Sequence, residues 1–158
     1  MTDHILLASK HRHQTSHIIM VDDDPEDVLL VEIALKRTEL PVNFHALSSA
    51  DDLLSLLDDA QNRATMLEQC VVLLDLNMPK MDGRKCLSIL RQDKRLNNLP
   101  IVVYSTSDTY DDVTKSYDQG ADAHLCKPDD LDELEKMMAM LYQFWLGPDS
   151  HRQSFRHY

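Results

Sequence analysis

The fold is decided by the stretch VVLLDLNMPKMDG at residues 71–83. Four apolar residues lead into Asp75, and a turn containing Pro79 and Gly83 follows. A short apolar run that ends in a carboxylate and a Pro/Gly turn is typical of a buried parallel strand that delivers the acid to the edge of a sheet. Ligands bind at that edge in open α/β sheets. Asp75 is therefore a candidate site residue.

Two further predicted strands end in charged residues. The apolar run at residues 18–21 leads into Asp22 and Asp23, and the last predicted strand ends in Lys127. Because the carboxyl ends of parallel strands meet at one edge of a sheet, we expect three carboxylates and one ammonium group to converge there. This combination predicts a magnesium and phosphate site.

The remaining sequence alternates between strand and helix patterns. Strands are predicted at residues 18–21, 42–47, 71–75, 101–104 and 123–127. Helices are predicted to begin at Pro25 behind an Asp24 cap, after Ser49, near Arg84, after Ser107 or Asp108, and at Leu131, while residues 61–69 are predicted to be a polar connection. Five strands alternating with five helices predict an α/β fold, a parallel sheet with helices on both faces.

Composition limits the possible functions. The 158 residues suffice for one domain, and the net charge of -11 is concentrated between Ile18 and Trp145. This negative charge repels the phosphates of nucleic acid, and we therefore expect protein partners or cations. Three cysteines make a disulfide framework improbable, and no apolar stretch has the length of a membrane span or a leader peptide. We therefore expect a soluble, cytoplasmic protein that contacts no membrane.

The motifs at the predicted strand ends resemble a known family. They are Val21-Asp22-Asp23-Asp24, Leu74-Asp75-Leu76-Asn77-Met78-Pro79 with Asp82-Gly83, Ser105, and Lys127-Pro128. In this order and spacing they resemble the receiver domains of two-component response regulators. The resemblance covers residues 18–146, with residues 1–17 as a flexible extension and residues 147–158 as a tail. It implies a flavodoxin-like (βα)5 doubly wound parallel sheet with strand order 2-1-3-4-5.

The resemblance also implies a role for each residue of the site. Asp75 is the expected phospho-acceptor, which attacks the phosphorus of a phosphohistidine. Asp23 and Asp75 are expected to bind Mg²⁺ directly, Asn77 to offer its backbone carbonyl, and Asp22 to act largely through metal-bound water. Lys127 is expected to pair with Asp75 at rest and with a phosphoryl oxygen after transfer.

A second group of residues is expected to respond to phosphorylation. By resemblance, Ser105 is the switch hydroxyl and the Lys127–Pro128 bond is cis. Thr106 stands beside the phosphoryl group where a small Ala is common, and its bulk is expected to slow entry or hydrolysis. His124 replaces the aromatic switch residue of the family, with a half-buried packing role as the alternative. The positions expected to tune the lifetime of the phosphate are Asn77 and Ser107.

A narrower resemblance concerns the expected partners. The Tyr104-Ser105-Thr106-Ser107 run and the closing Gln143-Phe144-Trp145-Leu146 are similar to stand-alone regulators paired with phytochrome-type histidine kinases. This resemblance implies phosphate transfer from a sensor histidine kinase, such as a bacteriophytochrome, or from a histidine phosphotransfer protein. It also implies a homodimer, with Phe144 and Trp145 in an apolar seam. Packing of the two rings onto their own core is the alternative.

The expected function is that of a response regulator without an output domain, because only residues 147–158 follow the last predicted helix. Such a domain catalyses its own phosphoryl uptake and loss and is not an enzyme acting on an independent substrate. One rival is a haloacid-dehalogenase-type hydrolase, which needs an acid where Asn77 stands. The other is a pseudo-receiver that binds partners without phosphorylation, which Thr106 and His124 leave open.

Overall fold

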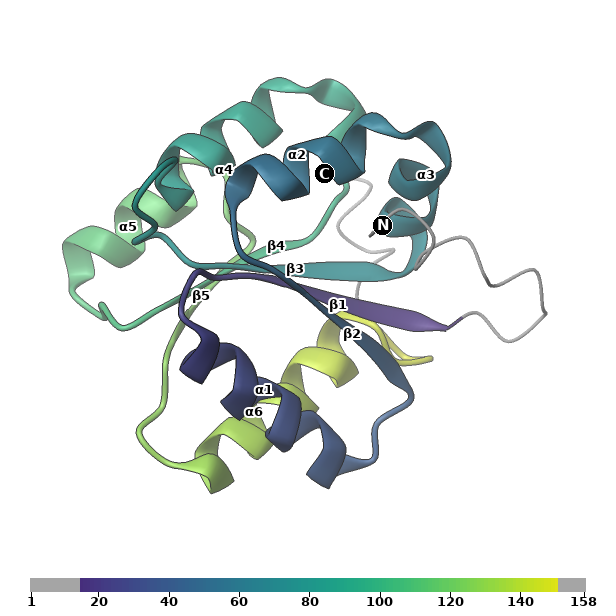
Figure 1. The fold of residues 1–158 in the computed structure, drawn as a ribbon, viewed down its shortest axis with the longest axis vertical. Coiled ribbons are helices and arrows are strands. Elements are labelled where there is room, and N and C mark those ends of the chain that lie inside the picture. Colours follow the sequence, from purple (N-terminus) through teal and green to yellow (C-terminus); the bar gives the residue numbers. More distant parts are fainter. Residues whose placement is uncertain (1–14, 151–158) are drawn as a thin grey trace.

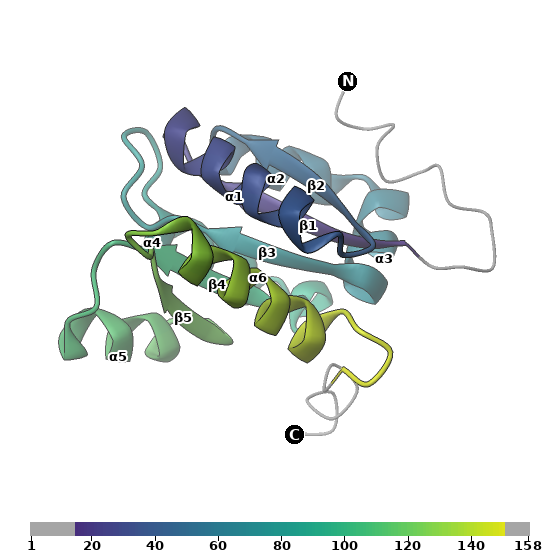
Figure 2. The ribbon, with the colours of Figure 1, turned by 90° about the horizontal axis from the view of Figure 1, so that it is seen from below.

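The computed structural model describes residues 15–150, which form a five-stranded parallel sheet between two layers of helices (Figures 1 and 2). The strands are β1 (Ser16–Val21), β2 (Val42–Leu47), β3 (Cys70–Leu74), β4 (Ile101–Ser105) and β5 (Ala123–Cys126). The helices are α1 (Pro25–Thr38), α2 (Ala50–Asp58), α3 (Ala60–Gln69), α4 (Gly83–Gln92), α5 (Tyr110–Asp118) and α6 (Leu131–Trp145), with a short 3₁₀ turn η2 (Lys94–Leu96). The strand order β2-β1-β3-β4-β5 confirms the predicted flavodoxin-like topology.

Both faces of the sheet are covered. Helices α1 and α6 lie on one face, and α2 to α5 lie on the other (Figure 1). Along β1, Ile18 and Met20 pack in the core with α1 and α6, whereas Ile19 and Val21 pack in the opposite core. Because side chains of a central strand meet apolar groups on both faces, its sequence is a continuous apolar run rather than an alternating one.

The helix starts follow the predicted capping chemistry in two cases. The Asp24 carboxylate accepts a 2.9 Å hydrogen bond from the backbone N–H of Glu26, and Pro25 begins α1. Ser49 caps α2, where its hydroxyl oxygen accepts a 3.2 Å hydrogen bond from the backbone N–H of Asp52. The prediction for α5 was wrong, because Thr109 rather than Ser107 or Asp108 provides the cap.

The largest difference from the sequence prediction lies between α2 and β3. Residues 61–69 were predicted to be a polar connection, but they belong to helix α3. Asp59 begins this helix by accepting a 2.9 Å hydrogen bond from the backbone N–H of Asn62. Asn62 and Met66 are fully buried one turn apart. The helix therefore forms through its cap and tertiary burial, although its sequence has little apolar periodicity.

The strand boundaries differ slightly from the predicted ones. Strand β1 begins at Ser16 rather than Ile18, so His17 belongs to the sheet, and β5 ends at Cys126 rather than Lys127. Most of the predicted N-terminal extension and of the predicted tail lies outside residues 15–150. Within that range, no helix has the length and hydropathy needed to cross a membrane.

The amino-terminal ends of the strands carry polar contacts of their own. The Arg91 guanidinium donates to the backbone carbonyls of Gly120, Leu96 and Leu99 and to the Asp122 carboxylate, each within 2.8–2.9 Å. At the other side of this edge, His17 Nδ1 and His45 Nε2 are 3.1 Å apart, and the two rings stack. Both contacts join segments that are distant in sequence.

Candidate functional site

The acidic residues converge because β1 and β3 are neighbouring parallel strands. Val21 pairs with Leu74, and the backbone N–H of Asp75 donates to the Val21 carbonyl at 3.0 Å. The next residues of both strands therefore leave the sheet side by side. Asp22, Asp23 and Asp75 each place a carboxylate oxygen within 4.8 Å of the other two. This is the convergence that the strand ends predicted.

The three carboxylates differ in exposure. Asp22 and Asp75 are buried, with 2% and 6% of their surface exposed, whereas Asp23 is exposed. Oxygen-only donors on a partly open surface fit a hard divalent cation that keeps several water ligands. The carboxylate cluster is thus suited to hold such a cation beside Asp75.

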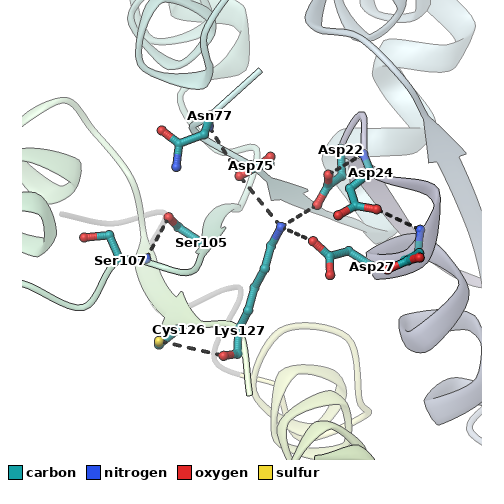
Figure 3. Close-up of polar contacts among 10 residues, drawn as sticks. Asp22, Asp24, Asp27, Asp75, Asn77, Ser105, Ser107, Cys126 and Lys127 are labelled. Carbon is teal, nitrogen blue, oxygen red and sulfur yellow. Dashed lines mark hydrogen bonds and ion pairs between the residues drawn. The ribbon is translucent and has the colours of Figure 1, made fainter. Parts of the chain in front are cut away.

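Lys127 directly follows β5, and its side chain extends to the acidic cluster. Its backbone N–H donates to the Ser105 carbonyl at 2.8 Å, which fixes the start of the side chain beside the end of β4. Its Nζ lies 2.6 Å from Asp27 Oδ2 and 2.8 Å from Asp22 Oδ2, but 3.9 Å from Asp75 Oδ1 (Figure 3). The predicted resting pair with Asp75 is therefore a long contact, and the close partners of Lys127 are Asp22 and Asp27.

Asp27 is the residue of the site that the sequence prediction missed. It is the third residue of α1, and its carboxylate points toward the Lys127 ammonium group (Figure 3). The available signal was an acid in the first turn of a helix that starts at the edge where the other acids lie. An acid at that position is also common for stabilising the helix start, so the pattern did not single it out.

The charges and burial of the site change the pKa values of its residues. Burial raises the pKa of Asp75, and the nearby Asp22 charge raises it further, against the opposing effects of Lys127 and of the Asn77 N–H. Burial alone would lower the pKa of Lys127. Hydrogen bonds to Asp22 and Asp27 and the charge of Asp75 outweigh burial, so the pKa lies above its usual value. A bound cation would favour the ionised form of Asp75 that nucleophilic attack requires.

The predicted cis peptide bond before Pro128 was wrong. No peptide bond within residues 15–150 is cis, so the Lys127–Pro128 bond is trans. A trans X–Pro bond is the favoured isomer, and Lys127 reaches the acidic cluster without the cis form. Pro128 still follows the end of β5 directly.

Ser105 and His124 both contact the loop after β4. Ser105 is fully buried, and its Oγ accepts a 3.2 Å hydrogen bond from the backbone N–H of Ser107. His124 Nε2 lies 2.8 Å from the Ser107 carbonyl, to which it donates, while Nδ1 lies 2.9 Å from Ser116 Oγ. Both predicted switch side chains are thus coupled to Ser107, whereas Thr106 and Asn77 are exposed at the rim.

The first residue of α4, Gly83, lies too close to the preceding backbone for any other residue type. Its backbone N–H donates to the Leu76 carbonyl at 2.9 Å. A Cβ atom at this position would lie 2.6 Å from the Leu76 Cα and closer still to the Asp75 carbonyl. Only glycine lets α4 start this close to the backbone of Asp75 and Leu76.

Comparison with known proteins agrees with this geometry. Residues 18–139 match the family described as "Response regulator receiver domain". The chain is 33% identical over 129 residues to the response regulator Rcp1 of Synechocystis sp., with 82% of this chain and 88% of Rcp1 covered. The chain belongs to the response regulator receiver family. The predicted family and fold are therefore confirmed.

Solved receiver structures resemble the fold closely. The Mn²⁺-bound form of Rcp1 has a TM-score of 0.68 at 31% identity and covers 84% of this chain and 96% of its own. The phosphorylated cyanobacterial phytochrome response regulator RcpA has a TM-score of 0.69 at 29% identity, covering 82% and 93%. RPA3017, a response regulator in red light signaling of R. palustris, reaches 0.74 at 27% identity, covering 84% and 94%. These relatives agree with the narrower resemblance to phytochrome-associated regulators.

Proposed function

We propose that this receiver domain is a phosphorylation-controlled protein-binding switch in which Asp75 accepts a phosphoryl group from the phosphohistidine of a histidine kinase or phosphotransfer protein. The carrying observation is the convergence of Asp22, Asp23 and Asp75 within 4.8 Å, with the Lys127 ammonium beside them. Asp22, Asp23, Asp75 and the backbone carbonyl of Asn77 are the proposed Mg²⁺ ligands.

In the proposed step, a carboxylate oxygen of Asp75 forms a bond to phosphorus while the phosphorus–nitrogen bond of the phosphohistidine breaks. The electron pair of that bond stays on the departing imidazole. When bound, Mg²⁺ supplies positive charge that offsets the acidic residues and the transferring phosphoryl group. Lys127 contributes a second positive charge on a flexible stem, within 3.9 Å of Asp75.

The proposed response to phosphorylation runs through the loop after β4. Ser105 and Thr106 are the proposed hydroxyl contacts of the phosphoryl group. Movement of the Ser105 hydroxyl would break its hydrogen bond to the Ser107 N–H, and Ser107 in turn contacts His124. We propose Asn77 and Ser107 as the positions that set how quickly water removes the phosphate.

The test is intact mass after incubation with acetyl phosphate and Mg²⁺. The wild-type chain is expected to gain about 80 Da, the mass of one covalent phosphoryl group on an aspartyl nucleophile. The gain should require Mg²⁺ and be absent from Asp75→Asn. Absence of the adduct with every phosphoryl donor would leave a phosphate-independent interaction module, the pseudo-receiver alternative.

The proposed phosphoryl donor is a phytochrome-type histidine kinase, since RcpA is a phytochrome response regulator and RPA3017 is a response regulator in red light signaling. The test is transfer from a purified, autophosphorylated bacteriophytochrome kinase to this chain, compared with transfer from an unrelated histidine kinase. Faster transfer from the phytochrome-type kinase is expected. Equal or slower transfer would reject this partner while leaving the role of Asp75 intact.

A homodimer is proposed along α6 and the edge strand β5. An apolar groove of about 670 Å³ is lined there by Leu125, Met137, Met140 and Phe144, among others. Phe144 is 39% exposed, but Trp145 is only 5% exposed and packs in the core of its own chain. The proposed seam therefore centres on Phe144, and analytical ultracentrifugation of wild type and Phe144→Asp tests it. A wild-type monomer at all concentrations, phosphorylated or not, would reject the dimer.

A further inference from the structure

Asp27 is the carboxylate closest to Lys127, although it belongs neither to the metal cluster nor to the acceptor. The Asp27 Oδ2 to Lys127 Nζ distance is 2.6 Å, against 3.9 Å from the same ammonium to Asp75 Oδ1. The Lys127 side chain is only 10% exposed and that of Asp27 is 27% exposed. A charge-assisted hydrogen bond of this length with limited solvent access is among the stronger polar contacts in proteins.

The start of α1 places Asp27 for this contact. Asp24 uses its carboxylate as the helix cap, and Pro25 sets the first helical residue. Asp27 follows two residues later, where its side chain turns toward the sheet edge and meets the end of Lys127 (Figure 3). Asp27 takes no part in the cap, so its carboxylate is available to the lysine.

Three carboxylates thus compete for one ammonium group. In the arrangement of Figure 3, Asp27 and Asp22 hold it on the α1 side of the site, away from hydrogen-bond distance to Asp75. The Tyr104 ring lies beside the same ammonium, with its centroid 5.5 Å from Nζ. The two short contacts therefore direct the Lys127 ammonium group toward α1, and its contact with Asp75 is the longest of the three.

We propose that Asp27 is a positioning residue that restrains Lys127 in the unphosphorylated state and sets how readily this lysine reaches Asp75. This inference rests on the proposed function of Asp75 as the acceptor. During phosphoryl transfer, the lysine exchanges its bond to Asp27 for one to a phosphoryl oxygen, which its flexible stem permits. Asp27 therefore opposes phosphoryl uptake, and removal of its charge is expected to accelerate it.

The experiment compares three variants with wild type under saturating Mg²⁺ and acetyl phosphate, with the uptake rate followed by intact mass. Asp27→Asn is expected to raise the rate about five-fold, the size of a well-formed partly exposed ion pair. Asp24→Asn is the matched control, because it removes the same charge three residues away and an asparagine still caps the helix. It should stay within about two-fold of wild type. Asp27→Glu, which keeps the carboxylate, should return the rate toward wild type.

A second readout needs no phosphoryl donor. In the wild-type NMR spectrum, nuclear Overhauser contacts are expected between the Lys127 ε-methylene and the Asp27 β-protons, and the Lys127 ¹⁵Nζ resonance should shift in Asp27→Asn but not in Asp24→Asn. Absence of these contacts in the wild type would overturn the proposed restraint even if a variant failed to fold.

The outcomes separate this inference from the proposed function. If wild type gains no phosphoryl group, the role of Asp75 fails first. If wild type is phosphorylated but Asp27→Asn and Asp24→Asn have equal rates, the acceptor role stands and the role of Asp27 is overturned. An equal acceleration in both variants would assign the effect to the general acidity of the site.

Discussion

Strand β1 has a buried titratable residue near its beginning, His17, and another just past its end, Asp22, each with 2% of its surface exposed. At the amino edge of the sheet, His17 and His45 share one hydrogen bond between rings, and burial favours their neutral forms. At the carboxyl edge, Asp22 lies among other acids and is held by the Lys127 ammonium. The histidines of the amino edge thus favour their neutral forms, whereas the buried Asp22 of the carboxyl edge has a positively charged partner.

The charge balance of the two edges differs as well. Another polar contact of the amino edge pairs Arg91 with Asp122, one charge against one, and backbone carbonyl oxygens accept other hydrogen bonds from the guanidinium. In the carboxyl-edge site, Lys127 faces several carboxylates, of which Asp22, Asp27 and Asp75 lie within 4 Å. An excess of buried negative charge is costly unless a cation compensates it. The imbalance therefore makes the carboxyl edge the one suited to hold a cation.

The largest expected effect comes from removing the Lys127 ammonium group from the carboxyl edge. Lys127→Met leaves buried carboxylates without a counter-charge, so the free energy of unfolding in EDTA should fall by about 3 kcal/mol. Saturating Mg²⁺ should recover much of this loss, since the cation takes over the charge balance. Urea unfolding with and without Mg²⁺ measures both quantities. Lys115→Met, which removes an exposed pair with Asp111, serves as the control. Equal stabilisation of wild type and Lys127→Met by Mg²⁺ would contradict the comparison.

The amino edge should respond differently to the loss of its own cation. Arg91→Ala leaves Asp122 unpaired and several backbone carbonyls without a donor, so we expect a loss of about 2 kcal/mol that Mg²⁺ does not recover. Phosphoryl uptake per folded molecule should stay unchanged. Arg95→Ala, which breaks the exposed pair with Asp93, should cost much less stability than Arg91→Ala. Recovery of the Arg91→Ala loss by Mg²⁺ would show that the two edges are not independent.

The acids and the lysine of the site could be predicted from the sequence because each follows a strand. Asp22, Asp23, Asp75 and Lys127 are fixed to one edge once the strands are parallel, whatever the details of packing. Asp27 could not be singled out, because its role depends on which of several carboxylates a flexible lysine side chain reaches. That choice is made by tertiary distances, which strand and helix patterns do not contain.

Two other predictions failed because the local sequence pattern does not determine the structure there. Helix α3 has few apolar residues, and the burial that stabilises it includes an asparagine, Asn62, so the apolar pattern predicted a loop. The isomer of the Lys127–Pro128 bond came from resemblance alone. Intrinsic preference between the two isomers of an X–Pro bond is only about 0.5–1 kcal/mol, so the local sequence does not fix it.

The smallest expected effect concerns the pH dependence of stability at the amino edge. Burial and the neighbouring His17 lower the pKa of His45 to about 4, from 6.5. Between these values the unfolded chain binds the proton more readily, so this histidine contributes stability above about pH 6.5 that is lost as the pH falls toward 4. From pH 7 to pH 5, linkage with these pKa values gives at most about 2 kcal/mol, and the partial exposure of the ring reduces it, so wild type should lose about 1 kcal/mol more than His45→Gln, measured by urea unfolding.

The carboxyl edge should give the opposite slope in acid. The pKa of Asp75 is raised by burial and by Asp22, so the folded chain holds that proton more tightly than the unfolded chain. Its contribution is present below the unfolded pKa of 3.8 and is lost as the pH rises through the folded value. In EDTA, the His45 contribution to the free energy of unfolding increases with pH, and His45→Gln should abolish that increase. The Asp75 contribution decreases with pH, and Asp75→Asn should abolish that decrease. Because burial disfavours the charged form of both residues, an acid and a base should give slopes of opposite sign, and slopes that change in the same direction in both variants would contradict these pKa shifts.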